Sequence, residues 1–180
     1  RLKYFSLQGV RNLDYPGGAL SVVNSSSTKV SNASIFNNSG ENFGGGISLV
    51  GLYDFTLSNV LLYKNNLFNS DGGQSIKWGT AIYIERSLIN LSNITATRNL
   101  FQDSSTGATT IHWDYDSEII ITNCIIHGNE SSSIGRSNTD DTLEINHSNI
   151  EGIEDINTGY NFITGTNNFD STPNFVDFEN

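Results

Sequence analysis

The chain is poor in the residues that build crosslinks, metal sites and membrane spans. Its 180 residues include a single cysteine, Cys124, which excludes an internal disulfide and a cysteine-based zinc site. No run of about 18 or more apolar residues occurs, so the sequence predicts no membrane insertion. Lys+Arg number 9 and Asp+Glu number 19, giving a formal net charge of -10. This balance argues against nucleic acid as a partner, because phosphate binding relies on clustered Lys and Arg.

Asparagine, by contrast, is abundant and recurs at regular places. Six copies of one unit, spaced by roughly 23 to 34 residues, each carry an Asn (once a Ser), and a second Asn usually follows six residues later. Self-similarity at such a period is typical of a solenoid, in which each repeat packs on its neighbours. The paired positions are Ser6/Asn12, Asn32/Asn38, Asn59/Asn65, Asn93/Asn99 and Asn123/Asn129, with a partial sixth copy at Asn146 and Gly152.

Alternating apolar residues around each Asn predict three short strands per unit. The first strand opens on small residues, as at Gly45-Gly46, and continues with apolar pairs such as Ile47 and Leu49. The second strand, with Phe55 and Leu57 as an example, precedes the first Asn of its copy, and the third strand follows that Asn. A period of two points alternate side chains to one face. Strands this short, repeated in one order, predict a right-handed parallel β-helix whose coils stack about 4.8 Å apart.

The first Asn of each copy stands at the bend between the second and third strands. Asn tolerates positive φ, and its amide can hydrogen-bond to the coils above and below. The sequence therefore predicts a stacked ladder at this turn. Its members are Asn32, Asn59, Asn93, Asn123 and Asn146.

Extra length falls almost entirely between the second Asn and the first strand of the next unit. We therefore expect all variable loops at one edge of the solenoid, which in repeat proteins is often the binding face. These loops are expected at 14–16, 39–43, 66–78, 100–106 and 130–141.

Residues 44–49 read Gly-Gly-Gly-Ile-Ser-Leu, and residues 30–38 and 121–129 each place an Asn between two strands. These segments resemble the recurrent units of the bacterial secreted right-handed β-helix repeat proteins of the pectate-lyase-like superfamily. The C-terminal part resembles the last coils of such proteins, at 146–152, 166–170 and 173–177. The resemblance implies an all-β, right-handed parallel β-helix solenoid with three short strands per coil, about five to six coils and an Asn ladder at one turn.

The repeats fill the chain, and we expect one β-helix domain over 1–180 with an irregular terminal coil over 156–180. The chain begins at Arg1 inside a repeat and ends without a terminating cap, which suggests a fragment of a longer protein. The resemblance implies an exported protein with an extracellular or cell-surface location.

Stacking the first strands predicts one cluster of chemically active residues on the outer face. Tyr83 and Glu85 fall in one coil, and His112 and Asp114 fall at matching positions in the next. Glu85, Asp114 and His112 are therefore the candidate catalytic residues, since adjacent carboxylates can form an acid–base pair. Tyr83, and Trp78 in the longest loop, are candidate glycan platforms. The alternative is that the outer residues are ordinary solvated side chains and that Trp78 packs its loop onto the coil.

One short segment has the alternating acids of a calcium loop. Its candidate metal ligands are Asp114, Asp116 and Glu118. The Gly and the distal Glu of an EF-hand loop are missing from it. We expect no cofactor, with calcium as the alternative.

These patterns favour a non-catalytic β-helix module of an exported cell-surface or extracellular protein. It would act as a structural spacer or as an adhesive, glycan-binding surface, because no acid, base and cation converge in the sequence. One alternative is a carbohydrate-active enzyme, a polysaccharide lyase or glycosidase that uses Glu85 and Asp114. Another is a self-assembling unit whose unpaired strand edges stack end to end. The expected partners are a polysaccharide, a cell-surface glycan or other protein chains.

Overall fold

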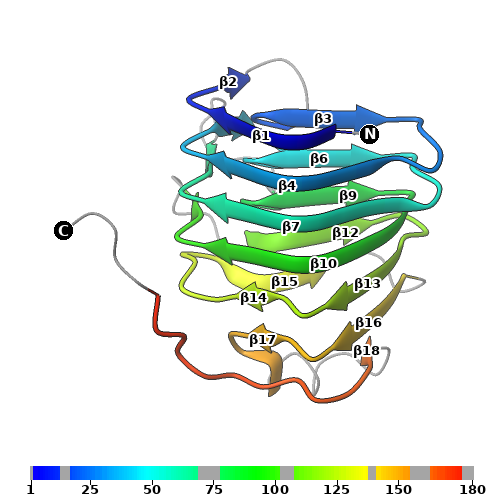
Figure 1. The fold of residues 1–180 in the computed structure, drawn as a ribbon, viewed down its shortest axis with the longest axis vertical. Coiled ribbons are helices and arrows are strands. Elements are labelled where there is room, and N and C mark those ends of the chain that lie inside the picture. The colour runs from blue at the N-terminus through cyan, green and yellow to red at the C-terminus, as the bar shows by residue number, and fades with distance from the viewer. Residues whose placement is uncertain are drawn as a thin grey trace.

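Parallel strands in three stacked sheets make up the fold in the computed structural model (Figure 1). The structure describes residues 2–12, 17–68, 78–101, 108–137, 141–154 and 163–175. All strand pairings in these ranges are parallel and join one repeat to the next. The arrangement confirms an all-β fold of parallel strands and is consistent with a parallel β-helix.

Sheet A contains the longest strands. Its main path consists of β1 (Leu2–Gln8), β4 (Lys29–Phe36), β7 (Phe55–Tyr63), β10 (Leu88–Thr97), β13 (Glu118–Thr122), β16 (Thr142–Asn146) and β18 (Ile163–Thr164). Two short strands extend this sheet: β14 (Ile125–Ile126) pairs with β10, and β17 (Asn149–Ile150) pairs with β14.

The remaining strands form sheets B and C. Sheet C consists of β3 (Leu20–Val23), β6 (Ile47–Val50), β9 (Ile82–Glu85), β12 (Thr109–Asp114) and β15 (Ser132–Arg136). Sheet B has short strands only: β2 (Arg11–Asn12), β5 (Ser39–Glu41), β8 (Asn66–Phe68) and β11 (Leu100–Phe101). Along the chain, successive strands of the first coils pass from sheet A to sheet B to sheet C.

The strand boundaries correct the sequence prediction in two places. In β4, β7 and β10 the predicted second and third strands are one continuous strand, bent at its Asn. In sheet B, β5, β8 and β11 lie in segments predicted as loops, and so does β15 in sheet C. Strands of two or three residues are too short to show a period, and β15 has Ile134 as its one large apolar residue. The predicted variable loops also include residues 14–16, 69–77, 102–106 and 138–140. These residues lie outside the described ranges.

The bend in sheet A is made by residues with positive φ. Asn32, Asn59, Asn93 and Asn123 have φ between 53° and 54°. Asn59 Nδ2 donates to Asn32 Oδ1 at 3.1 Å, and Asn93 Nδ2 donates to Asn59 Oδ1 at 3.0 Å. These side chains lie on the outside of the sheet, where Asn59 and Asn93 are exposed. We call them the outer asparagine row.

The first and last copies of the repeat were aligned wrongly from the sequence. The register of β1 on β4 places Tyr4, with φ 54°, opposite Asn32, so Ser6 is not at the bend. In the last copy Asn146 pairs with Thr122, and His147, with φ 52°, is at the bend instead. Alignment on Asn missed both, because Tyr and His take this conformation without resembling Asn.

A second asparagine row lies inside the coil, where the sequence predicted no ladder. Asn38, Asn65 and Asn99 are fully buried. The Nδ2 groups of Asn38, Asn65 and Asn99 donate to the Oδ1 of Asn65, Asn99 and Asn129, respectively, each at 3.0 Å. Asn65 Nδ2 also donates to Ile35 O at 2.8 Å, and the equivalent bonds recur in each coil. We call these residues the inner asparagine row.

Inward-pointing side chains of the sheets form one apolar core. Trp113 and Cys124 are both 1% exposed, in keeping with their predicted inward positions. Glycines at the start of sheet C strands let the chain turn against the next coil. A Cβ on Gly18 would lie 1.9 Å from Gly45 O, and one on Gly45 would lie 2.3 Å from Thr80 O. Backbone contact this close explains the small residues at these positions.

We predict that Asn65→Ala lowers the free energy of unfolding by about 2 to 4 kcal/mol, because it removes the buried acceptor of Asn38 N and of Asn38 Nδ2, together with the side-chain donor to Ile35 O. Urea denaturation followed by circular dichroism measures this change. Asn59→Gly is the matched control. It removes an exposed amide while keeping positive φ accessible, and we expect a loss below about 1 kcal/mol. An equal loss of unfolding free energy in the two variants would contradict the prediction that the inner row contributes more to stability than the outer row.

Candidate functional site

The outer face of sheet C brings together the residues that the sequence selected. Tyr83 pairs with His112, and Glu85 pairs with Asp114, as predicted from the repeat. The expected exposure is wrong, however. Tyr83 and His112 are each 3% exposed and Asp114 is 1% exposed, while Glu85 is partly exposed. The cluster is therefore mostly covered and is not an open strip of solvated side chains.

Stacked rings cover this face. The Phe43 and Tyr83 rings lie 4.7 Å apart, and the Trp78 and His112 rings also lie 4.7 Å apart, with an angle of 2° between the latter two. Trp78 pairs by a β-bridge with Phe43 and stacks at 6.5 Å on Tyr83. Trp78 thus packs the end of its loop onto the coil, which was the alternative to an exposed glycan platform.

His112 is held as a neutral ring between two hydroxyl groups. Its Nδ1 lies 3.1 Å from Thr109 Oγ1, and its Nε2 lies 2.9 Å from Ser137 Oγ. Burial lowers the pKa of His112 to about 3, because the charged ring would lose its hydration. The ring is uncharged at neutral pH, its lowered pKa makes it a weak base, and both nitrogens are engaged, so it suits packing better than acid–base catalysis.

Both oxygens of the Glu85 carboxylate are occupied. Oε2 accepts a hydrogen bond from the Tyr83 hydroxyl at 3.1 Å, and Oε1 lies 2.7 Å from Arg86 Nη1. Burial, followed by the charge of Glu85, raises the pKa of Tyr83, which keeps the hydroxyl protonated as a donor. Glu85 is therefore a partner within the cluster and has little freedom to act on a substrate.

Asp114 is the least satisfied member of the cluster. Its Oδ1 accepts a hydrogen bond from Tyr115 N at 3.0 Å, whereas Oδ2 is buried without a hydrogen-bond partner. Burial raises the pKa of Asp114, and the charges of Asp141 and Glu85 add to the effect. At 1% exposure the carboxyl group has no contact surface for the sugar oxygen or water that a glycosidase acid or base must reach.

The three predicted metal ligands do not lie in one environment. Asp114 is buried, while Asp116 and Glu118 are exposed. Within the described ranges, no group of three or more His, Cys, Asp or Glu residues is arranged to hold a metal ion. Calcium binding stays a prediction, and the described residues form no ready-made coordination site for it.

A shallow groove lies along the outer asparagine row of sheet A. It has a volume of about 330 Å³ and crosses three coils. Its lining consists of Asn32, Ala33, Ser34, Asn59, Val60, Leu61, Asn93 and Thr95. The repeated Asn residues that line the groove are visible in the sequence, but their pattern predicts only a structural ladder and no groove.

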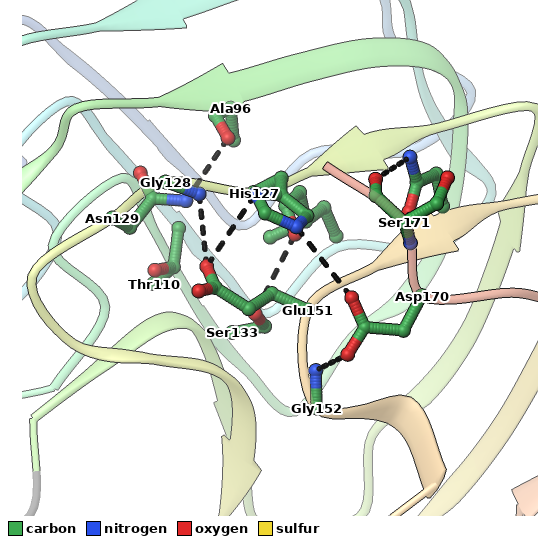
Figure 2. A network of polar contacts seen from close by, with 12 residues as sticks. Ala96, Thr110, His127, Gly128, Asn129, Ser133, Glu151, Gly152, Asp170 and Ser171 are labelled. Carbon is green, nitrogen blue, oxygen red and sulfur yellow. Dashed lines mark hydrogen bonds and ion pairs between the residues drawn. The ribbon is translucent and has the colours of Figure 1, made fainter. Parts of the chain in front are cut away.

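The C-terminal coils carry a second polar cluster that the sequence did not indicate (Figure 2). His127 Nδ1 lies 3.8 Å from Glu151 Oε2, and His127 Nε2 lies 3.5 Å from Asp170 Oδ1. The same carboxylates accept hydrogen bonds from Gly128 N and Gly152 N, each at 2.8 Å. The cluster thus ties the terminal segment to the two coils before it. His127, Glu151 and Asp170 follow no repeated spacing in the sequence, and they meet because of the way the coils stack.

No protein-family model, curated protein or solved structure matches this chain. Among the described residues, no helix has the length and apolarity needed to cross a bilayer. The parallel sheets are compatible with a β-helix or solenoid fold, and no relative supports a particular superfamily.

We predict that the stabilisation from His112 depends on pH. The folded pKa of about 3 lies below the unfolded value of about 6.5, so the unfolded chain binds the proton preferentially between these values. The stabilisation is complete above about pH 6.5 and is lost as the pH falls towards about 3.

Urea denaturation measures the free energy of unfolding of the wild type and of His112→Gln. The difference between them should shrink as the pH is lowered from about 7 to about 4. Phe43→Leu, which removes a ring and no titratable group, should differ from the wild type by a constant amount. A constant difference for His112→Gln would contradict the prediction.

We predict that Asp170→Ala loosens the terminal segment. The substitution removes the acceptor of Gly152 N and one carboxylate beside His127. Hydrogen exchange at Gly152 and at residues 169–171 should become about threefold to tenfold faster, with the upstream coils unchanged. Glu154→Ala, an exposed acid nearby in the sequence, serves as the control. Equal exchange in both variants would show that the cluster does not hold this segment.

Proposed function

We propose that the chain is a non-catalytic, right-handed β-helix module of an exported cell-surface or extracellular protein. It serves as a stiff structural spacer and as an adhesive, glycan-binding surface. The directions of the arrows in Figure 1 support the right-handed winding: sheet A runs to the left in front and sheet C to the right behind it, as the chain descends. The parallel register and the two asparagine rows support the stiffness, because each coil is bonded to the next at several points.

The observation that carries the proposal is that Tyr83, His112 and Asp114, three of the four members of the polar cluster on sheet C, are buried. Tyr83 bonds to Glu85, and His112 bonds to two neighbouring hydroxyl groups. Asp114 has one carboxylate oxygen without a hydrogen-bond partner, but the residue is 1% exposed. Catalytic groups need partners that a substrate can replace and a surface that it can reach. Three members of the cluster are buried, and the partly exposed Glu85 is bonded through both carboxylate oxygens, so we assign the cluster to the packing of the coil.

The extracellular assignment is supported by the sequence resemblance and by the chemistry of the surface. A net charge of -10 keeps a long solenoid soluble, and the single cysteine is buried at Cys124, away from oxidants.

A turnover screen tests the non-catalytic assignment. The wild type and Glu85→Gln/Asp114→Asn are incubated with neutral and uronate-containing polysaccharides, with and without calcium, and new reducing ends and unsaturated products are measured. We expect no product from either protein. Product formed by the wild type and lost in the double variant would overturn the proposal and establish a lyase or glycosidase.

A further inference from the structure

We propose that the groove along the outer asparagine row binds a neutral, hydroxyl-rich glycan chain that lies across the coils. The groove is formed by β4, β7 and β10, which contribute the same two or three positions from each coil. This inference rests on the proposed glycan-binding role and gives it a site and a ligand class. The site is separate from Tyr83 and Trp78, which pack within the ring stack on sheet C.

The outer amides have unused hydrogen-bonding capacity. An Asn side chain offers two N–H donors and an oxygen with two lone pairs. Asn59 donates once to Asn32 and accepts once from Asn93, which leaves it one donor and one lone pair. Asn93 donates once, to Asn59. Because both side chains are exposed, these remaining groups face the groove and solvent, where they can pair with hydroxyl groups.

The inner row makes the contrast clear. The Asn65 amide donates to Ile35 O and Asn99 Oδ1, and its oxygen accepts from Asn38 Nδ2 and Asn38 N. Its donors and lone pairs are all used, and the side chain is fully buried. The same residue type at the outer row is left half satisfied at a surface that is hollowed.

The spacing of the row suits an extended polymer. Equivalent residues on neighbouring parallel strands lie about 4.8 Å apart, so the groove presents the same donor and acceptor pair at each coil. Successive sugar units of an extended glycan present their hydroxyl groups with a repeat of comparable length. A chain laid across β4, β7 and β10 can thus contact each coil in the same way.

The groove also has the apolar surface that a sugar ring needs. Leu61 is 38% exposed and lies in register between Ser34 and Thr95. Sugar rings have an apolar face of C–H groups as well as hydroxyl groups at their edges. Leu61 can cover that face, while the hydroxyls of Ser34 and Thr95 and the amides of the row bond the edges.

Charge selects a neutral ligand. None of the eight residues that line the groove is ionisable. A uronate or sulfate group placed there would find no cation, and the net charge of -10 would repel it. The groove therefore fits neutral glycans and disfavours acidic ones.

The test measures the binding of hexasaccharides to the intact chain by isothermal titration calorimetry. The neutral probes are cellohexaose, xylohexaose and mannohexaose, and the acidic probe is hexagalacturonate. We expect at least one neutral probe to bind more tightly than the acidic one. Asn59→Gly/Asn93→Gly should weaken binding of that probe about fivefold to tenfold or more, because two amide contacts are lost. Leu61→Ser removes the apolar contact with the sugar ring and keeps the amides, so it should weaken binding about threefold or more.

Asn123→Gly is the matched control. Asn123 has the same exposed position and positive φ one coil further on, but it does not line the groove, so binding should not change. Equal binding by the groove variants and the wild type would overturn the groove while leaving a glycan-binding module. Preference for hexagalacturonate, or no binding by any probe, would also overturn the inference. Turnover of a probe would instead overturn the proposed function.

Discussion

The bond on which the rest of the structure depends is the amide-to-amide contact of the inner asparagine row. Each buried side chain joins the carbonyl of one coil to the amide of the next, as Asn65 does with Ile35 and Asn99. A coil displaced by one residue would leave several buried polar groups without partners, so the coils are held in one register. That register aligns Tyr83 with His112 and builds the outer row from single residues far apart in the chain.

The sequence revealed those parts of the fold that have a period. Sheet C apart from β15, both halves of β4, β7 and β10, and the inward positions such as Trp113 follow from alternation of apolar residues. Sheet B could not be predicted, because β8 and β11 are too short to alternate. The burial of His112 could not be predicted from the sequence either. It depends on Trp78, which reaches sheet C from another loop and breaks the repeat.

The two faces of the coil treat polar residues in opposite ways. On sheet C most of the polar side chains are buried and rings pack over them, so the face resembles a second, smaller core. On sheet A the same solenoid leaves amides and hydroxyl groups open at a hollow surface. From sequence alone the two faces are difficult to distinguish, because both present polar residues at alternate positions. The difference arises from what lies over each strand.

The two asparagine rows also run in opposite senses along the solenoid axis. In the inner row Asn38 donates to Asn65, a residue of the following coil. In the outer row Asn93 donates to Asn59, a residue of the preceding coil. Aligned amide dipoles add up along a row and polarise one another, but two antiparallel rows largely cancel. A β-helix built in this way can gain coils and keep the cooperative strength of each row without accumulating a large electric dipole between its ends.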